Sequence, residues 1–393
     1  MRYYILLVAL LCMSYIPYAQ SFEGSKIGNG IRFVPKDSSF SIQWNTRFQT
    51  EYVGVQDLES NDYSDAFTIR RFRIKFKGFL VDPRFGYKIE LALANRDQGD
   101  FFAENNGAAN IVLDAVIKWR FLPNWQLWIG QTKLPGNRER VISSGTLQMV
   151  DRSRLNSRYN IDRDQGLQLR HEHKIGQVVL REIGSISSGE GRNVTISNKS
   201  GYDYTTRFEF LPFGKFTANG DYFGEDLMRE KTPKLSLAAS YDYNVGTNRE
   251  RGQLGYFIFD NNGDPQHSTL ATLFADAFFK YNGISLAYEY ANKRVANGEL
   301  SGIGTDGSTI YFYTGHAHNV QGGYLFKNNW SIDARYTVNK PDKYVDEAEN
   351  RYEIGFSKYI AGHTVKLQAN VVYRDRLTSH DQMLYFAQLE LGF

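Results

Sequence analysis

The sequence predicts an all-β protein, a transmembrane antiparallel β-barrel of about 16 strands. Apolar and polar side chains alternate almost to the end of the chain, and short turns alternate with long polar connections. No stretch after residue 20 is long and apolar enough for a membrane helix. The pattern alone permits 16 to 18 strands, because residues 244–269 can hold either an extra strand or a long loop.

The first 20 residues, 1–20, are expected to be a signal peptide that is cleaved off. Arg2 precedes an apolar run from Ile5 to Met13, which is much shorter than the roughly 20 residues of a spanning helix. Cys12 lies in this run and is the only cysteine, so the exported chain is expected to lack thiols and disulfides. Its stability must then come from backbone pairing and packing.

Residues 21–39 are expected to be a short periplasmic N-terminal extension, and residues 40–393 the barrel domain. Alternation is clearest in residues 68–78, TIRRFRIKFKG, where bulky apolar residues separate four cations. These cations are Arg71, Arg73, Lys75 and Lys77. A sheet that spans a membrane must close to pair every backbone group, so its apolar face contacts lipid and the cations face a water-filled lumen.

The connections follow the plan of a bacterial outer-membrane barrel, with tight periplasmic turns and longer outer loops. Short turns such as LVDPRFG, FLPNWQ, FLPFGK and KYNGIS interleave with long polar stretches at 53–67, 95–109, 134–164, 292–309 and 339–350. The chain ends LYFAQLELGF, and a last strand that closes on Phe393 resembles the signal read by the barrel assembly machinery of the outer membrane.

Residues 129–153, IGQTKLPGNRERVISSGTLQMVDRS, resemble a stretch of the phosphate-selective porin O/P family. There a strand ending in Gly-Gln-aromatic-Lys-x-Pro leads into a long loop with a Ser-Ser pair and a later acidic-Arg-Ser. The segments RRFRIKFKG and RDQGLQL fall where the family has similar segments, whereas Thr132 replaces the usual aromatic residue. The resemblance implies a 16-stranded porin that forms a homotrimer and passes anions of the phosphate or polyphosphate type.

Basic residues outnumber acidic ones on the non-lipid face of the strands before residue 211, whereas later strands are nearly balanced. A positive wall in a low-dielectric frame raises the local concentration of anions, so an anion-preferring channel is expected. The basic ladder expected to line the pore comprises Arg47, Arg71, Arg73, Lys75, Lys77, Lys88, Lys118, Arg120 and Lys133.

The third long connection, from Leu134 to Asp164, is expected to fold into the lumen and narrow it, as the equivalent loop does in general porins. Its arginines are candidates to bind oxyanions, since a guanidinium group offers two parallel hydrogen bonds. These constriction-loop arginines are Arg138, Arg140, Arg152, Arg154, Arg158 and Arg163. The alternative is that they pair with Glu139, Asp151, Asp162 and Asp164 and fix the loop to the wall.

Two histidine pairs, His171 with His173 and His316 with His318, are incomplete ligand sets, so neither a metal nor a cofactor is expected. No Gly-x-Ser-x-Gly or other nucleophile motif is present, so no catalytic residue and no enzymatic activity are expected. A net charge of +3 is too small to indicate a nucleic-acid partner.

The sequence therefore predicts an outer-membrane porin that forms a water-filled, anion-preferring diffusion channel. The alternatives are a general porin without phosphate preference, a closed structural or adhesin barrel, and, least favoured, an outer-membrane hydrolase. The expected partners are outer-membrane lipid, small phosphate-like anions, the assembly machinery through Phe393, and further copies of the chain in a homotrimer.

Overall fold

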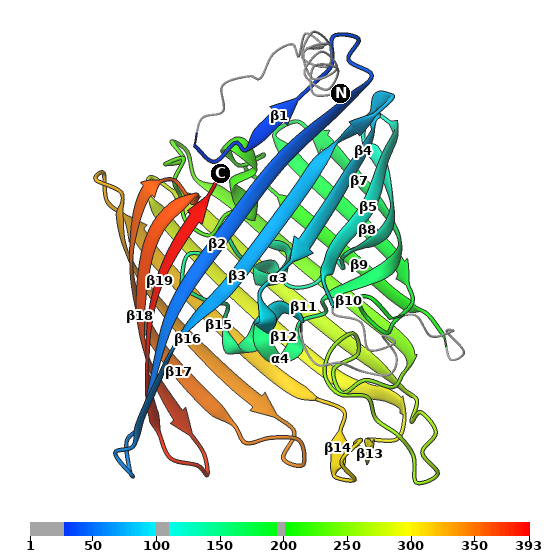
Figure 1. The fold of residues 1–393 in the computed structure, drawn as a ribbon, viewed down its shortest axis with the longest axis vertical. Helices are drawn as coiled ribbons and strands as arrows, with labels where there is room; N and C mark the ends of the chain where they lie inside the picture. The colour runs from blue at the N-terminus through cyan, green and yellow to red at the C-terminus, as the bar shows by residue number, and fades with distance from the viewer. Residues whose placement is uncertain (1–26, 99–109, 195–200) are drawn as a thin grey trace, which may run out of the picture.

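Sixteen antiparallel strands close into a barrel in the computed structural model, which describes residues 27–98, 110–194 and 201–393 (Figure 1). Each strand pairs with its neighbours around the ring, and β19 (Gln382–Gly392) pairs with β2 (Phe40–Asp57) to close it. The short strand β1 (Ile31–Phe33) and the C-terminus lie at the same end of the barrel (Figure 1). The predicted all-β barrel is confirmed.

The remaining barrel strands are β3 (Tyr63–Leu80), β4 (Asp82–Ala92), β5 (Val112–Leu122), β6 (Trp125–Lys133), β7 (Arg163–Ile175), β8 (Val178–Ser187), β9 (Asp203–Leu211), β10 (Lys234–Thr247), β11 (Ser268–Tyr281), β12 (Ile284–Gly298), β15 (Gly315–Leu325), β16 (Trp330–Pro341), β17 (Glu349–Ala361) and β18 (Val365–Arg376). A separate hairpin is formed by β13 (Ser301–Ile303) and β14 (Thr309–Tyr311). Short helical segments are α2 (Asn95–Gln98), α3 (Arg138–Val141), α4 (Arg154–Tyr159) and the 3-10 segment η2 (Thr217–Tyr222).

Apolar side chains face outward and charged ones inward, the reverse of a soluble protein. Glu353 on β17 is buried while Ile354 is 54% exposed, and Lys366 on β18 is buried while Leu367 is 47% exposed. Such a surface suits contact with lipid acyl chains. No helix among the described residues is long and apolar enough to cross a membrane.

Several connections differ from the prediction. Residues 248–267 contribute only isolated bridges and no barrel strand. The number of barrel strands, left open because of residues 244–269, is therefore 16. Residues 53–67 are mostly strand, because β2 and β3 extend toward one another and leave only a short turn. The prediction of a tight turn at FLPFGK is wrong, since residues 212–233 form a long connection between β9 and β10 that includes η2.

The short strand β1 (Ile31–Phe33) lies within the predicted extension, residues 21–39, and continues the sheet. Because β19 pairs with β2 only as far as Arg47, the start of β2 has a free edge, and β1 pairs there with Ile31 opposite Trp44. Covering an exposed strand edge removes a site for unwanted pairing between chains. The predicted signal peptide, residues 1–20, lies outside the described residues.

Candidate functional site

The predicted basic ladder lies on the inner face of the barrel. Its members are Arg47 on β2; Arg71, Arg73, Lys75 and Lys77 on β3; Lys88 on β4; Lys118 and Arg120 on β5; and Lys133 on β6. In the sheet register Arg73 is opposite Arg47, and Lys77 is opposite Lys88. Adjacent cations repel one another, so this wall needs acidic partners or bound anions.

Five members of the ladder are bound by other protein groups. The contacts are Arg71 to Asp151 at 3.0 Å, Arg73 to Asp97 at 3.0 Å, Lys88 to Asp114 at 2.7 Å, Arg47 to Glu390 at 3.5 Å, and Lys133 to the carbonyl oxygen of Arg140 at 2.7 Å. In four of these contacts the partner is a carboxylate, which neutralises much of the local charge. This part of the ladder is therefore held by the protein itself.

The other four members, Lys75, Lys77, Lys118 and Arg120, make no hydrogen bond or ion pair with any residue that the structure describes. The Lys118 ammonium lies 3.8 Å from the ring centroid of Trp128, over its face. A cation above an aromatic face is stabilised without losing its charge. These four residues are called the mouth cations below.

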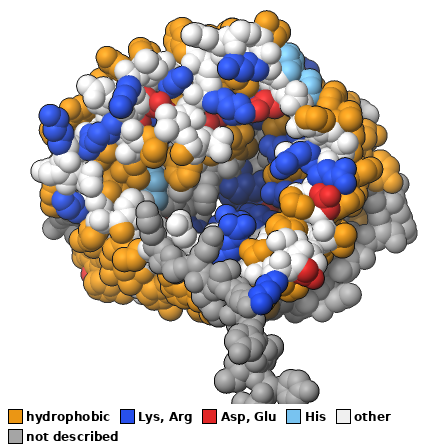
Figure 2. All heavy atoms as spheres, turned by 90° about the horizontal axis from the view of Figure 1, so that it is seen from above, with side chains coloured by type: hydrophobic (Ala, Val, Ile, Leu, Met, Phe, Trp, Pro, Cys, Tyr) orange, Lys and Arg blue, Asp and Glu red, His pale blue; other side chains and the backbone are white. Residues whose placement is uncertain are grey.

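Three of the mouth cations line a pocket of about 360 Å³. Its basic lining residues are Arg32, Lys77, Arg84, Lys88, Lys118 and Arg120. No acidic residue stands among the described residues that line it. Lys and Arg side chains gather around a hollow at the end of the barrel that holds the C-terminus (Figure 2). The field in this mouth is therefore positive.

A larger cavity, of about 630 Å³, shares Lys77 with this pocket and also exposes Lys75. It has a mixed lining, because acidic residues face it as well. His363, in the turn between β17 and β18, also lines it. Burial, reinforced by nearby Lys366 and Lys280, holds the pKa of His363 well below its usual range. This imidazole is therefore uncharged at neutral pH and adds nothing to the positive wall.

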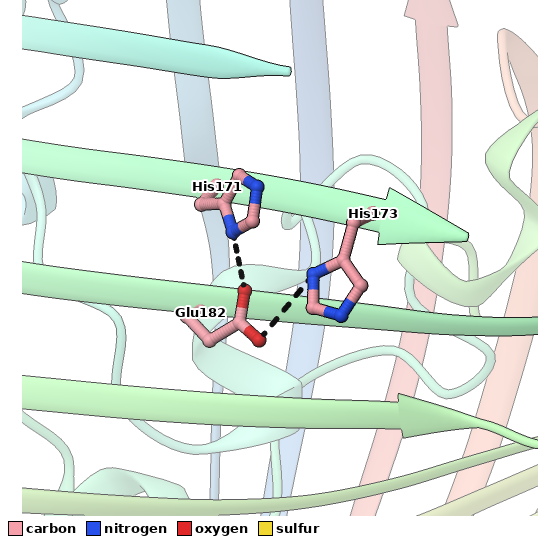
Figure 3. A group of neighbouring side chains, drawn as sticks. All are labelled: His171, His173 and Glu182. Carbon is pink, nitrogen blue, oxygen red and sulfur yellow. Dashed lines mark hydrogen bonds and ion pairs between the residues drawn. The ribbon is translucent and has the colours of Figure 1, made fainter. Parts of the chain in front are cut away.

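The histidine pairs lie on the outer face of the strands, away from these cavities. On β7, His171 and His173 alternate with the inward-facing Glu172, so this glutamate is not their neighbour. Their partner is Glu182 of β8, whose carboxylate contacts both imidazoles (Figure 3). His316 and His318 share one face of β15, where His318 lies 3.0 Å from the hydroxyl of Tyr288.

The loop of residues 134–162 contacts the ladder at Ser144. The hydroxyl oxygen of Ser144 accepts hydrogen bonds from Arg47 at 2.7 Å and from Arg73 at 3.2 Å. Two guanidinium groups from neighbouring strands thus converge on one oxygen atom of the loop. The same region of the loop, including Gly145 and Thr146, lines the 630 Å³ cavity.

Every constriction-loop arginine named from the sequence binds another protein group. Arg138 donates to Asp276 at 2.9 Å, Arg140 pairs with Asp162, Arg152 donates to the carbonyl oxygen of Glu139 at 2.7 Å, Arg154 pairs with Glu349, Arg158 lies 3.4 Å from Asp346, and Arg163 lies 3.3 Å from Asp114. Four of these partners, Asp114, Asp276, Asp346 and Glu349, lie outside the loop, so the contacts tie the loop to several parts of the wall.

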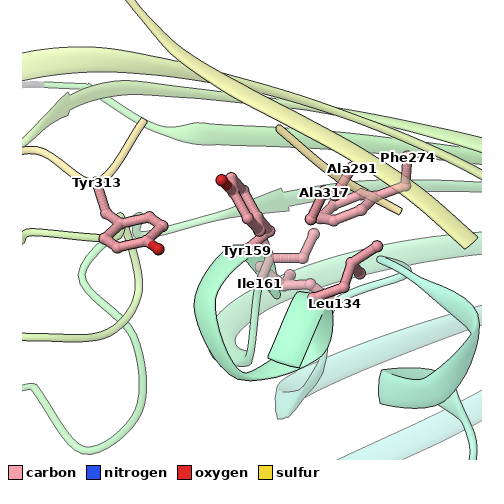
Figure 4. Packing of buried hydrophobic residues seen from close by; sticks show 8 residues of the cluster. Leu134, Tyr159, Ile161, Phe274, Ala291, Tyr313 and Ala317 are labelled. Atoms are coloured by element: carbon pink, nitrogen blue, oxygen red, sulfur yellow. The ribbon is translucent and has the colours of Figure 1, made fainter. Parts of the chain in front are cut away.

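Helix α4 packs against the inner side of the wall formed by β11, β12 and β15 (Figure 4). Leu155 and Tyr159 of the helix are fully buried against Phe274, Ala291 and Ala317. The alanines are the reason the helix can approach the strands, because their side chains occupy little space. This apolar contact reinforces the ion pairs that hold the loop.

A second inward segment, residues 212–233, was missed by the sequence analysis. The Lys280 ammonium, from β11, donates to three carbonyl oxygens of this segment, those of Gly220, Phe223 and Glu225 at 2.9, 2.9 and 2.7 Å. The amide of Gly224 donates to the carbonyl oxygen of Thr146 at 2.6 Å. The two inward segments therefore touch each other inside the barrel.

A β-bulge in β3 adds another cation that strict alternation assigns to the outer face. The register shifts between Arg71 and Ile69, so Arg70 turns inward beside Arg71. Both arginines bind Asp151 of the loop, at 2.7 and 3.0 Å. Burial alone raises the pKa of a carboxyl, but the attraction of Arg70 and Arg71 prevails and lowers the pKa of Asp151. The only local sign was two successive arginines.

Comparison with known proteins agrees with this architecture. The chain matches the family described as Phosphate-selective porin O and P over residues 42–380. A relative from Aquifex aeolicus (strain VF5), an uncharacterized protein, is 22% identical over 365 residues, covering 85% of this chain and 82% of the relative.

Solved structures of porins share the fold at low sequence identity. The anion-selective porin from Comamonas acidovorans has a TM-score of 0.56 at 9% identity, covering 90% of this chain and 100% of that one. OmpT of Vibrio cholerae, folded in vitro and in its trimer form, has a TM-score of 0.51 at 12% identity, covering 90% and 99%. With the family match extending over nearly the whole barrel, the chain is an outer-membrane porin that belongs to the phosphate-selective porin O and P family.

Proposed function

We propose that this porin is an anion-preferring diffusion channel and that the mouth cations create the preference. The observation that carries the proposal is the 360 Å³ pocket, whose described lining holds six basic residues and no acidic one. Low-dielectric walls focus the field of such a cluster into the aqueous passage. Anions are concentrated there and cations are repelled before either meets the narrower part of the channel.

Phosphate or polyphosphate oxyanions are the substrate class that best fits the next contacts. Past the mouth, Arg47 and Arg73 converge on Ser144, and Lys75 lines the same cavity. Guanidinium groups suit oxyanions because their planar donors form parallel, charge-assisted hydrogen bonds. The description of the matched family supports the same class of anion.

The loop of residues 134–162 narrows the channel in this proposal, and its arginines hold it in place. Each of those arginines is already engaged by a carboxylate or a carbonyl oxygen of the protein. Removing a buried cation from its partner is costly, so these side chains are poor ligands for a passing ion. The preference for anions then belongs to the mouth cations, which make no hydrogen bond or ion pair with a described residue.

The remaining parts of the proposal concern export and assembly. Residues 1–20 are cleaved after export, residues 21–39 stay on the periplasmic side, and residues 40–393 form the barrel. A homotrimer is the proposed assembly, because OmpT of Vibrio cholerae, which shares the fold, has a trimer form. The assembly machinery recognises the last strand through Phe393.

Reversal potentials in planar bilayers under a KCl gradient test the proposal. Replacing Lys75, Lys77, Lys118 and Arg120 by Gln removes four charges that no described residue pairs, but keeps long polar side chains. We expect the barrel to fold and the anion-to-cation permeability ratio to fall to about one. A parent protein that shows no steady conductance would instead indicate a closed structural barrel.

In a matched control variant, Gln replaces four exposed basic residues that make no ion pair with a described residue. They are Arg294, Lys327, Lys340 and Lys343. Its net charge equals that of the mouth variant, so a general effect of protein charge appears in both. The control variant is expected to retain the parent's permeability ratio. If the mouth variant also retains that ratio, the channel is a general porin and the proposed preference is wrong.

A further inference from the structure

A cluster of three potential metal ligands lies on the outer face of the barrel, close to the short turn between β7 and β8. His171 and His173 project from the same face of β7 because they are two positions apart. Glu182 projects from β8 and lies directly opposite His171 in the register. Two paired strands therefore fix all three side chains on one patch (Figure 3).

The spacing of the ligand atoms suits a tetrahedral ion. Nδ1 of His171 lies 3.0 Å from Oε2 of Glu182, and Nδ1 of His173 lies 3.7 Å from Oε1. Each residue offers a ligand atom within 4.8 Å of the others. Bonds of about 2.0–2.2 Å in a tetrahedral zinc site place neighbouring ligand atoms about 3.3–3.6 Å apart. The two separations from the histidine nitrogens to the carboxylate bracket that distance, and the histidine nitrogens lie within 4.8 Å of each other.

The surroundings leave the cluster accessible and orient it. The side chains are 22%, 32% and 39% exposed for His171, His173 and Glu182, so a fourth coordination position is open to the surroundings of the barrel. The ring of Trp125 stacks on His171 with centroids 4.1 Å apart and planes 17° apart. A stacked ring restricts rotation of the imidazole and holds it in the geometry seen here.

We propose that His171, His173 and Glu182 form a binding site for Zn²⁺ or a similar transition-metal ion at this rim of the barrel. Two imidazoles and one carboxylate with an open position are a known ligand set for zinc, whereas Ca²⁺ and Mg²⁺ prefer oxygen ligands. The site is separate from the channel, because its side chains face away from the lumen. It is independent of whether the pore prefers anions.

Calorimetric titration of the tag-free, detergent-solubilised porin with Zn²⁺ tests the site after removal of metals by a chelator. Equimolar, saturable binding is expected, and Mg²⁺ should give none. His171→Gln, His173→Gln and Glu182→Gln should each weaken binding by more than about tenfold, because loss of even an outer-shell partner commonly costs 10- to 100-fold. Zn²⁺ should also raise the unfolding temperature of the parent but not of His171→Gln.

The matched control is the double variant His316→Gln with His318→Gln. It removes a second outward-facing histidine pair, which forms no group of three metal ligands among the described residues. This variant should bind Zn²⁺ like the parent. Heat-modifiable electrophoretic mobility identifies variants that fold. The proposal is overturned if the folded parent does not bind Zn²⁺, or if binding is lost in the control and kept in the His171 and His173 variants.

Discussion

The guanidinium group of Arg47 donates a 2.7 Å hydrogen bond to the hydroxyl oxygen of Ser144, which joins the barrel wall to the inward loop. Arg73 donates to the same oxygen at 3.2 Å. The hydroxyl occupies the point at which two fork-shaped donors converge. In the proposed path of a phosphate-type ion, an anion oxygen takes this point and the hydroxyl becomes a further donor to it.

Ser144→Ala should therefore weaken the block of chloride current by phosphate. Loss of one hydrogen bond of about 0.5–1.5 kcal/mol corresponds to a roughly two- to tenfold higher half-blocking concentration. Ser143→Ala is the matched control, because Ser143 lines the same cavity, but among the described residues its hydroxyl oxygen accepts a hydrogen bond only from the amide of Gly145 and none from the ladder. Equal phosphate block in both variants and the parent would remove Ser144 from the anion path.

The period of two in the strands made the ladder and the lipid-facing surface predictable. A strand has a fixed alternation, so a single register assigns each residue to one face. Lys75 and Lys77 followed this rule, but Arg70 did not. The bulge that turns Arg70 inward depends on how β2 pairs with β3, and the local sequence does not determine that pairing.

The contacts of the inward segments were beyond prediction for a different reason. Arg138 binds Asp276, which lies 138 positions later in the chain. No local pattern identifies the distant strand that a loop meets. The segment from 212 to 233 was missed because Pro212 and Gly214 are typical of tight turns, although here they begin a longer connection.

Asp151→Asn should destabilise the folded porin by about 1–3 kcal/mol, because Arg70 and Arg71 lose their charged acceptor. Urea unfolding in lipid vesicles measures the change. Asp264→Asn is the control, since Asp264 is an exposed loop acid whose side chain has no hydrogen bond to a described residue. A loss of stability in the control equal to that of Asp151→Asn would contradict the assigned role.

The contribution of Asp151 should also depend on pH in a defined direction. Its pKa is lowered in the folded state, because Arg70 and Arg71 outweigh the effect of burial. The stabilisation is then fully present above the ordinary carboxyl value of about 3.9 and declines as the pH falls below it toward the folded-state pKa. The difference in unfolding free energy between parent and Asp151→Asn should be constant from neutral pH to about 5 and shrink under stronger acid.

Anion preference should decrease as the salt concentration rises. Mouth cations attract anions through water, and the screening length falls from about 10 Å at 0.1 M to about 3 Å at 1 M salt. Reversal potentials measured at both concentrations should give a permeability ratio that moves toward one at the higher salt. The variant with Gln at Lys75, Lys77, Lys118 and Arg120 should show little change. Equal salt dependence in parent and variant would assign the preference to other residues.

Deletion of Phe393 should reduce assembly into the outer membrane without reducing export. The amide and carbonyl groups of Phe393 form reciprocal hydrogen bonds of 3.0 Å with Thr46, so this residue completes the pairing that closes the ring. Its ring meets Trp44 edge to face with centroids 5.8 Å apart. Export depends on the N-terminal residues and should be unaffected, so the deleted protein is expected to accumulate in the periplasm.

Phe393→Tyr and Phe393→Ala separate the ring from the backbone pairing. Both variants keep the backbone hydrogen bonds to Thr46, but only tyrosine keeps an aromatic ring against Trp44. If the assembly machinery reads the terminal aromatic residue, heat-modifiable barrel recovered from membranes should be near the parent level for tyrosine and clearly lower for alanine. If alanine assembles as well as tyrosine while the deletion fails, the backbone pairing alone is required, and recognition through the ring must be abandoned.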